Sequence, residues 1–294
     1  MLGALLGLAS TVTAGAQVCN GRAEYCSRIY SNVSQVAAHD AAFVGILPTQ
    51  NQHKTVTNQL NLGIRFLQGQ THKDPITHKL QMCHTTCWEE NAGTAVKFLT
   101  QVKNFLDGHP NEVVTVLLTN GDNVDASMFD DALTKSGAKK YIFTPSTGSD
   151  VLPINEWPTL GQMIDANQRL VFVLDYHADQ KRFPYILDEF SYFWETPFDT
   201  TDKDFKQCDV NRGAPAAGKM YLVNHFLDVK LFKDVFVPDE LHAGRTNAVS
   251  GSGSIMDQAN RCQGIFHQGP KAVLLDYIDK GAPMQAELAL NGLL

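Results

Sequence analysis

The chain has 294 residues, of which 44% are hydrophobic and 19% charged, and its formal net charge is −7. This length and composition suit a globular protein with one large core or two ordinary ones, and no strong linker divides the sequence. The acidic balance and the lack of any Lys/Arg run argue against nucleic acid as a partner. They also provide no electrostatic attraction toward anionic lipid.

The N-terminus predicts an export signal. An apolar stretch from Leu2 to Ala9 leads to the small residues Ala14-Gly15-Ala16, and we expect cleavage after Ala16. The apolar run is too short, and too interrupted by polar residues, for a transmembrane helix. We therefore expect a secreted, extracellular protein with a signal peptide at residues 1–16 and a single domain at residues 17–294.

The six cysteines, all in the mature part, are an even count that suits an oxidising compartment. Proximity along the chain suggests three disulfides: Cys19–Cys26, Cys83–Cys87 and, as the remaining pair, Cys208–Cys262. A metal cluster is the alternative for Cys83, His84 and Cys87, but paired zinc thiolate sites usually show C-x₂-C spacing and a second pair, which are absent. The sequon Asn32-Val33-Ser34 agrees with secretion and predicts a glycoprotein.

Eight apolar runs predict strands at Gln35–His39, Leu62–Gln68, His78–His84, Glu112–Asn120, Arg169–Tyr176, Phe190–Glu195, Met220–Phe226 and Ala272–Tyr277. Helical spacing between them is clearest at Ala92–Leu106, with further candidates at Ser127–Ser136, Leu160–Ala166 and Ile255–Arg261. Nearly continuous apolar strands imply burial on both faces, as in a parallel barrel wrapped by helices. We expect an α/β fold, an irregular (β/α)8 TIM barrel, because the crossovers 45–60 and 229–254 are too polar or broken for one clean helix.

Polar side chains stand at the expected strand ends, where a barrel of this kind gathers its reactive groups. They are His39, Gln68, His84, Thr119, Asp175, Glu195, Asn224 and Asp276. The first and eighth strands become neighbours once a barrel closes, so Asp276 can bond one nitrogen of His39. Two imidazoles can divide a phosphodiester cleavage between them, one accepting a proton from the attacking hydroxyl and the other donating a proton to the leaving oxygen.

The segments VAAHDAAF, GIRFLQGQTH, MCHTTC, EVVTVLLTNGD and AVLLDY follow one another in an order that resembles the X domain of phosphatidylinositol-specific phospholipase C. More narrowly, the chain is similar to secreted fungal phospholipase C-like phosphodiesterases over residues 36–281. The resemblance implies that His39 is the general base, assisted by Asp276, and that His84 is the general acid. It also places Asp40 in the catalytic group, and it implies attack by an inositol 2-hydroxyl that yields a cyclic phosphodiester and an alcohol.

The chain departs from this family pattern where a positive charge should stand. The calcium-dependent enzymes carry carboxylates where this chain has Gln68, Gln70 and Thr119, and the metal-independent bacterial enzymes carry an arginine at the position of Gln70. Without that charge, roughly several kcal/mol of transition-state stabilisation is lost. No cofactor is certain. A divalent cation such as calcium or magnesium, bound by Asp40 and Asp122, is one replacement, although Asn-Gly-Asp-Asn also forms a turn readily. Other candidate charges are His72, Lys73 and His225.

Several strand-end side chains could bond the hydroxyls of a sugar or inositol ring: Gln68, Gln70, Asp175, Tyr176, Glu195, Asn224 and His225. We expect a monomer that acts on a phosphodiester or a phospholipid headgroup, with at most transient contact with a membrane surface. One alternative is a catalytically weak or inactive barrel that binds an inositol phosphate, a glycan or a protein. Another is a glycosidase that uses Asp175 and Glu195 as its carboxylate pair.

Overall fold

The computed structural model describes residues 15–294 except Asp234. The predicted signal peptide at residues 1–16 therefore lies almost wholly outside the described residues. Within them, no helix is long and apolar enough to cross a membrane.

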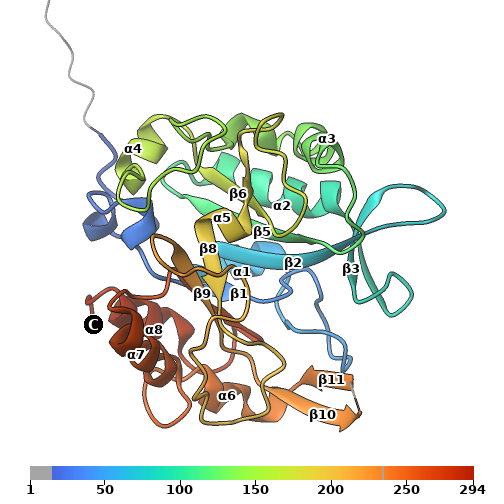
Figure 1. Ribbon diagram of the computed structural model, residues 1–294, viewed down its shortest axis with the longest axis vertical. Helices are drawn as coiled ribbons and strands as arrows, with labels where there is room; N and C mark the ends of the chain where they lie inside the picture. Colours follow the sequence, from blue (N-terminus) through green and yellow to red (C-terminus); the bar gives the residue numbers. More distant parts are fainter. Residues whose placement is uncertain (1–14, 234) are drawn as a thin grey trace, which may run out of the picture.

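The centre of the molecule is a curled sheet of parallel strands, which confirms the predicted α/β barrel architecture (Figure 1). Its path runs β7-β6-β5-β2-β1-β12-β9-β8. In the described part of the chain the two edge strands do not pair with each other, so the barrel is irregular and incomplete. The parallel strands are β1 (Gln35–Ala38), β2 (Phe66–Lys73), β5 (Val114–Asn120), β6 (Leu170–Leu174), β7 (Ile186–Asp188), β8 (Phe193–Glu195), β9 (Met220–Asn224) and β12 (Ala272–Leu275).

The first and last strands lie side by side, as the sequence predicted. Ala38 on β1 is in register with Leu275 on β12, and the His39 N–H donates to the Leu275 carbonyl at 2.9 Å. Both strands are buried along their whole length, which suits their small and apolar residues. The residues that directly follow them, His39 and Asp276, therefore leave the sheet next to each other.

The third predicted strand is not a barrel strand, and this corrects the sequence-based assignment. Residues Leu80–His84 form β3, which pairs antiparallel with the outer part of β2 and with β4 (Glu90–Thr94). The reason is that β2 continues to Lys73, beyond the expected end at Gln68, and so projects out of the barrel as one arm of a hairpin. The short strand β7, which the sequence did not predict, becomes one of the parallel strands instead.

Two other predicted strands begin three or four residues too early, while, apart from the end of β2 given above, the remaining strand ends differ from the structure by one or two residues. Residue Leu62 is the last residue of helix α1 (Val56–Leu62), which Gly63 ends with a φ of 111°, a left-handed conformation that glycine adopts without strain. The first part of the run Phe190–Glu195 belongs to the short helix α5 (Glu189–Tyr192), whose N-terminus is capped by the Asp188 side chain. In both places a local capping residue, which the apolar pattern does not reveal, decides the boundary.

The predicted helices are present. They are α2 (Ala95–Gly108), α3 (Ser127–Ser136), α4 (Leu160–Asp165) and α7 (Ile255–Phe266). The structure also contains two helices that the sequence did not predict, α6 (Ala243–Thr246) and α8 (Pro283–Leu290). Helix α2 packs on α3, and α7 packs on α8, at opposite sides of the sheet (Figure 1). Short 3₁₀ helices occur at Ala23–Tyr25, Tyr30–Asn32, Ala138–Tyr141 and Glu240–His242.

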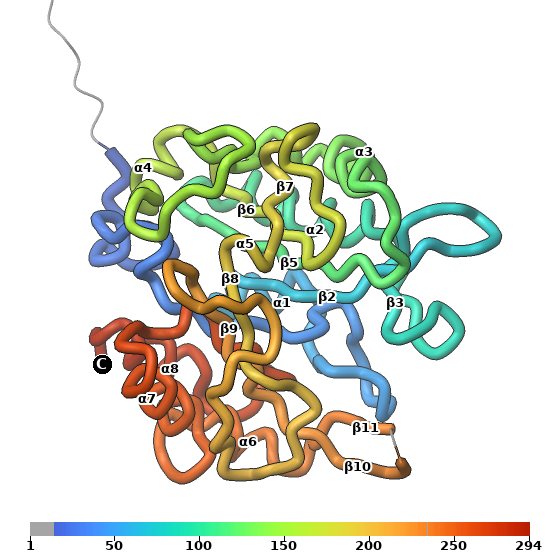
Figure 2. The backbone as a smooth tube through the Cα atoms, in the orientation of Figure 1, coloured from blue at the N-terminus to red at the C-terminus, as the bar shows by residue number. Residues whose placement is uncertain are grey.

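The crossover at residues 229–254 contains an antiparallel hairpin instead of one long helix, in agreement with its broken pattern. Its strands are β10 (Asp228–Phe232) and β11 (Val235–Pro238). The residues after β11 lie beside the loop that follows β1, since His53 Nε2 is 3.3 Å from Glu240 Oε1 (Figure 2). These two segments therefore border the same end of the barrel, where β1 and β9 finish.

All six cysteines form disulfides, in the predicted pairs Cys19–Cys26, Cys83–Cys87 and Cys208–Cys262. The alternative of a cysteine metal cluster is therefore wrong. The third bond ties the loop after β8 to helix α7, and the second closes the turn that directly follows β3.

Candidate active site

His39 and Asp276 form a hydrogen-bonded pair at the ends of β1 and β12. The Nδ1 atom of His39 lies 2.8 Å from Asp276 Oδ1, and the imidazole stacks flat on Phe226, with ring centroids 3.7 Å apart. Asp276 also accepts a hydrogen bond from Asn51 Nδ2 at 3.0 Å. This arrangement fixes the ring from its Nδ1 side and leaves Nε2 for chemistry.

Asp40 lies between the two imidazoles. Its Oδ2 atom is 3.5 Å from His39 Nε2 and 3.4 Å from His84 Nε2, and its side chain is fully buried. Residue 40 adopts a φ of 44°, which is uncommon for an aspartate. The two glutamines of β2 hold it there: Gln68 Oε1 accepts from the Asp40 N–H at 2.8 Å, and Gln70 Nε2 donates to Oδ2 at 2.9 Å. The structure thus brings both histidines to one carboxylate oxygen.

The pair of carboxylates changes the acidity of His39. Burial on its own acts to lower the pKa of His39, but Asp40 and Asp276 outweigh it and raise the pKa to about 9. Burial also raises the pKa of Asp276, an effect that His39 opposes. At neutral pH the imidazole of the free protein is therefore mainly protonated, and the fraction able to act as a base grows as the pH approaches 9.

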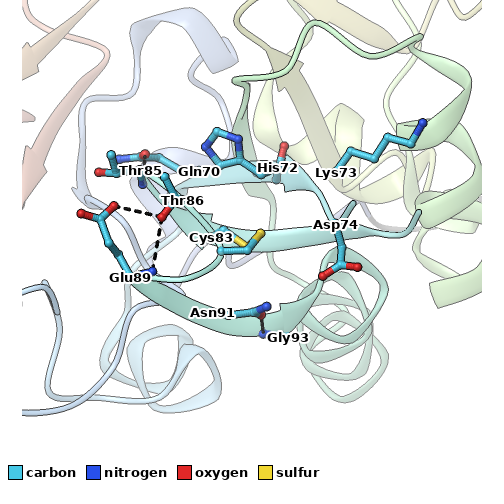
Figure 3. The surroundings of a disulfide bond; sticks show 12 residues. Gln70, His72, Lys73, Asp74, Cys83, Thr85, Thr86, Glu89, Asn91 and Gly93 are labelled. Carbon is cyan, nitrogen blue, oxygen red and sulfur yellow. Dashed lines mark hydrogen bonds between the residues drawn. A yellow bond between two sulfur atoms is a disulfide. The ribbon is translucent and has the colours of Figure 1, made fainter. Parts of the chain in front are cut away.

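His84 ends β3 and is held by the turn after it. The disulfide of Cys83 closes this turn, and the Thr86 hydroxyl donates to Glu89 Oε2 at 3.1 Å within it (Figure 3). The backbone N–H of Thr85 donates to Gln70 Oε1 at 3.2 Å. Because the other end of the Gln70 amide bonds Asp40, this one glutamine connects the β3 turn to the residues of β1.

A cavity of about 450 Å³ opens at this rim of the barrel. Its lining includes both histidines and the predicted polar residues Gln68, Gln70, Thr119, Asp175, Glu195 and Asn224. It also includes residues that the sequence did not single out, namely Asn51, Glu189, Arg212, Phe226 and Asp228. The cavity therefore has a histidine end, with the residues just described, and a carboxylate end formed where β6, β7 and β8 finish.

Arg212 is the centre of the carboxylate end. Its guanidinium donates to Glu195 Oε2 at 2.5 and 3.0 Å, and Asn224 Nδ2 donates to the same oxygen at 3.3 Å. Burial acts to lower the pKa of Arg212, but Glu195 and Glu189 outweigh it and raise the pKa. The arginine is therefore a permanent positive charge that fixes the Glu195 carboxylate.

Two further carboxyl groups at this end are poor acids. Burial raises the pKa of Asp175 to about 6, against hydrogen bonds from the backbone N–H groups of Asn120 and Tyr176. Burial and the neighbouring Glu195 raise the pKa of Glu189 well above its usual range, and Glu189 Oε1 has no hydrogen-bond partner among the described residues. Such groups can both donate to and accept from the hydroxyls of a polyol.

Three predicted site residues do not reach the cavity. Tyr176 is exposed and packs against Phe190, with ring centroids 5.3 Å apart. His225 is fully buried, because Gln258 and the Thr246 carbonyl satisfy its two nitrogens inside the fold. The expectation that His225 binds substrate is therefore corrected, whereas that for Tyr176 stays a prediction.

Asp122 is the third predicted site residue that does not line the cavity. Its carboxylate lies 2.9 Å from His72 Nδ1 and accepts a hydrogen bond from the backbone N–H of Lys73. Asp122 therefore fixes the hairpin arm of β2.

Among the described residues, no three His, Cys, Asp or Glu side chains converge as metal ligands. Asp40 does have a buried free oxygen, Oδ1, but Gln70 turns its amide nitrogen, a donor, toward this carboxylate. These residues do not fit calcium, which takes 6–8 oxygen ligands.

A curled parallel barrel that gathers ionisable side chains at its rim is characteristic of TIM-barrel proteins. The family model described as PI-PLC X matches residues 25–291, so the chain belongs to the PI-PLC X domain family. Membership of this family and the barrel fold support a phosphodiesterase-type function.

Two relatives come from the fungus Arthroderma benhamiae. The chain is 50% identical over 299 residues to "PI-PLC X domain-containing protein 1", with 99% of this chain and 96% of the relative covered. It is 39% identical over 273 residues to an "uncharacterized secreted protein", with 90% of this chain and 60% of the relative covered.

Among solved structures, the phosphatidylinositol-specific phospholipase C from Listeria monocytogenes superposes with a TM-score of 0.59 at 15% identity, covering 92% of this chain and 95% of that one. A double mutant of the Staphylococcus aureus enzyme gives a TM-score of 0.56 at 15% identity, covering 94% of each chain. At this low identity the likeness shows that the fold is shared.

Proposed function

We propose that this protein cleaves a phosphoinositol-type or related phosphodiester by intramolecular attack, with His39 as general base and His84 as general acid. The observation that carries the proposal is the position of the two Nε2 atoms, 3.5 and 3.4 Å from one oxygen of Asp40 at the edge of the cavity. Two nitrogens that share one neighbouring atom can reach the attacking and the leaving oxygen of a single phosphate group.

In this reaction the internal hydroxyl of the substrate gives its proton to Nε2 of His39, and its oxygen attacks phosphorus. The bond from phosphorus to the leaving alcohol breaks, and the alcohol oxygen takes a proton from His84. The products are a cyclic phosphodiester and an alcohol. Asp276 accepts the Nδ1–H of His39, which selects the tautomer with a free Nε2 and stabilises the imidazolium that forms.

The carboxylate end would hold the polyol part of the substrate. Arg212, Glu195 and Asn224 form one connected network, and Asp175 lines the same cavity. Gln70 offers an amide where related enzymes carry an arginine or a calcium ligand, so the phosphoryl oxygens meet less positive charge. We therefore expect modest turnover that does not depend on a metal.

The alternative function is that of a binding protein without turnover. It is favoured by one observation: the Gln70 amide bonds Asp40 at one end and Thr85 at the other, and an amide offers the phosphate no positive charge. The glycosidase alternative fits less well, because Arg212 and Asn224 both bind the carboxylate of Glu195.

Turnover of two soluble phosphodiesters separates these functions. One is an inositol phosphodiester with a free hydroxyl next to the phosphate, and the other is its analogue with hydrogen in place of that hydroxyl. We expect cleavage of the first alone, at the same rate in chelator and in added calcium. Cleavage of both substrates would rule out intramolecular attack, loss of activity in chelator would require a metal, and cleavage of neither by folded protein would favour the binding function.

We also propose that the protein is secreted, as a monomer, and glycosylated at Asn32. The three disulfides and the relative described as secreted support export, and Asn32 is exposed at the surface. Contact with a membrane surface would be transient at most. Expression of the full chain in a eukaryotic host should yield protein in the medium, with a mature N-terminus at Gln17 and a mass that falls on treatment with an N-glycosidase. Retention in the cell would contradict the export signal.

A further inference from the structure

A third region of the cavity lies beyond the base His39 and is not used by the mechanism above. It is formed by Asp199, Phe226, Asp228, Phe236 and Pro238, which come from the segments that follow β8 and β9 and from the β10–β11 hairpin. We call these five residues the anionic pocket. Its walls are aromatic and apolar, while both of its polar side chains are carboxylic acids.

Asp228 is the unusual member of the anionic pocket. The residue is only 8% exposed, yet it lines the cavity. Among the described residues its carboxyl group has no hydrogen-bond donor and no ion-pair partner, although its backbone N–H is bonded to the Thr200 carbonyl. A buried carboxylate without a partner is costly, and such groups normally take up a proton or bind a cation. The fold thus presents an unsatisfied acceptor to whatever occupies the cavity.

No protein cation that lines the cavity is free to balance this charge. Arg212 is committed to Glu195, His39 lies between Asp40 and Asp276, and His84 Nε2 lies 3.4 Å from Asp40 Oδ2. In the part of the chain that the structure describes, no lysine lines the cavity. The negative charge that Asp228 gains when it ionises therefore has no partner in the protein, and a positively charged ligand would complement it.

The charges that face Asp228 agree with this conclusion. Burial is the main cause that raises the pKa of Asp228 to about 8; Asp276, Asp199 and Asp239 contribute in the same direction, and His39 opposes them. In the empty cavity the carboxyl group thus keeps a proton near neutral pH. A bound cation would replace that proton, so its affinity should increase as the pH rises toward 9.

We propose that the anionic pocket binds an organic cation, a protonated amine or a quaternary ammonium group, carried by the phosphodiester substrate. The aromatic rings of Phe226 and Phe236 suit the alkyl groups around such a nitrogen, and aromatic rings attract cations. A metal ion would not suit the pocket, because two carboxyl groups and apolar walls do not supply its oxygen ligands. This proposal refines the substrate class of the proposed function, and it rests on that function only in assigning the cation to a substrate.

Binding of choline tests the proposal without any turnover. Calorimetric titration of the mature protein at pH 8.5 would compare choline with 3,3-dimethyl-1-butanol, its uncharged isostere. We expect choline to bind at least tenfold more tightly than the isostere, and Asp228→Asn to weaken choline binding at least tenfold. Asp199→Asn should weaken it less, because Asp199 is exposed at the rim. Asp150→Asn, which changes an exposed carboxylate that does not line the cavity, is the matched control and should bind as the wild type does.

The proposal also predicts that choline affinity rises between pH 6 and pH 9 in the wild type and stays nearly constant in Asp228→Asn. Equal affinity for choline and its isostere, no choline binding by folded wild type, or unchanged binding in both aspartate variants would each overturn it. Calcium binding that depends on Asp228 and displaces choline would assign the pocket to a metal and would overturn it as well. Because none of these titrations requires cleavage, a failure here is distinct from a failure of the proposed reaction.

Discussion

The histidine end and the carboxylate end of the cavity are built in different ways. At the histidine end, the groups follow or end buried strands; a hydrogen bond joins His39 to Asp276, and Asp40 lies 3.5 Å from the other ring nitrogen of His39. At the carboxylate end, Arg212 comes from a long loop and reaches back to Glu195. The difference indicates that the first end provides the chemistry and the second provides recognition, so substitutions at the two ends should change kcat and KM separately.

The largest expected effect is at the histidine end. His39→Ala and His84→Ala should each reduce kcat by about 10²–10⁴-fold, because each removes a group that transfers a proton in the transition state. Steady-state kinetics on the soluble inositol phosphodiester measures this. His267→Asn is the control: residue 267 is exposed with a φ of 55°, a conformation that asparagine tolerates. Normal kcat in either alanine variant would refute the assignment of that histidine.

Substitution of Arg212 tests the other end. Arg212→Gln leaves Glu195 without its cation, so we expect KM to rise by roughly 10–100-fold while kcat changes less. Arg212→Lys keeps the charge but loses the two-pronged contact, and it should restore part of the affinity. If the glutamine variant instead lowers kcat and leaves KM unchanged, Arg212 acts on the transition state and the division between the two ends is wrong.

The acidity of His39 provides a spectroscopic test of the histidine end. Asp40→Asn and Asp276→Asn each remove a negative charge that raises the pKa of this imidazole, so each should lower it from about 9 toward its ordinary value of 6.5. NMR titration of the histidine side chains gives the pKa directly. The acidic limb of the pH–rate profile should move to lower pH in the same variants, and a pKa that stays near 9 in both would mean that other groups control it.

Asp228 should affect stability with a definite sign. Its pKa is raised in the folded state, from an ordinary value of 3.8 to about 8, so its contribution to stability is present below the ordinary value and is lost as the pH rises through the folded value. Asp228→Asn avoids this loss. We expect the free energy of unfolding of the variant, relative to wild type, to increase by about 2 kcal/mol between pH 6 and pH 9. Urea unfolding at both pH values checks it, and a relative stability independent of pH would show that Asp228 ionises normally.

The smallest effect is expected at the turn after β3. The Cys83–Cys87 disulfide closes a short loop, so replacing both cysteines by serine removes little chain entropy and should lower Tm only slightly. Because the turn holds His84, we expect kcat to fall a few-fold. Replacement of Cys19 and Cys26, which do not line the cavity, is the control and should leave kcat unchanged. Equal activity in both double variants would mean that the turn holds its shape without the bond.

Sequence reasoning succeeded where function follows strand order. The pairing of His39 with Asp276 could be predicted because the first and last strands of a barrel must meet. Helix α3 and two disulfides could be predicted from local spacing, and Cys208–Cys262 followed as the remaining pair. Prediction from the sequence failed where the direction in which a side chain points decides whether that residue belongs to the site. His225 was expected in the pocket, but its ring turns into the core and finds two partners there. Neither periodicity nor a motif marks Arg212, because it lies in an irregular loop and only the folded chain brings it to Glu195.

Phosphorus NMR on the wild-type protein tests the central claim most directly. The purified protein is incubated in chelator with phosphatidylinositol or with a soluble inositol phosphodiester, and the phosphorus resonances are followed over time. The two-histidine mechanism predicts that a cyclic phosphodiester accumulates first, at the same rate when calcium replaces the chelator. Direct appearance of an acyclic monoester, with no cyclic product at any time, would contradict intramolecular attack assisted by His39 and His84.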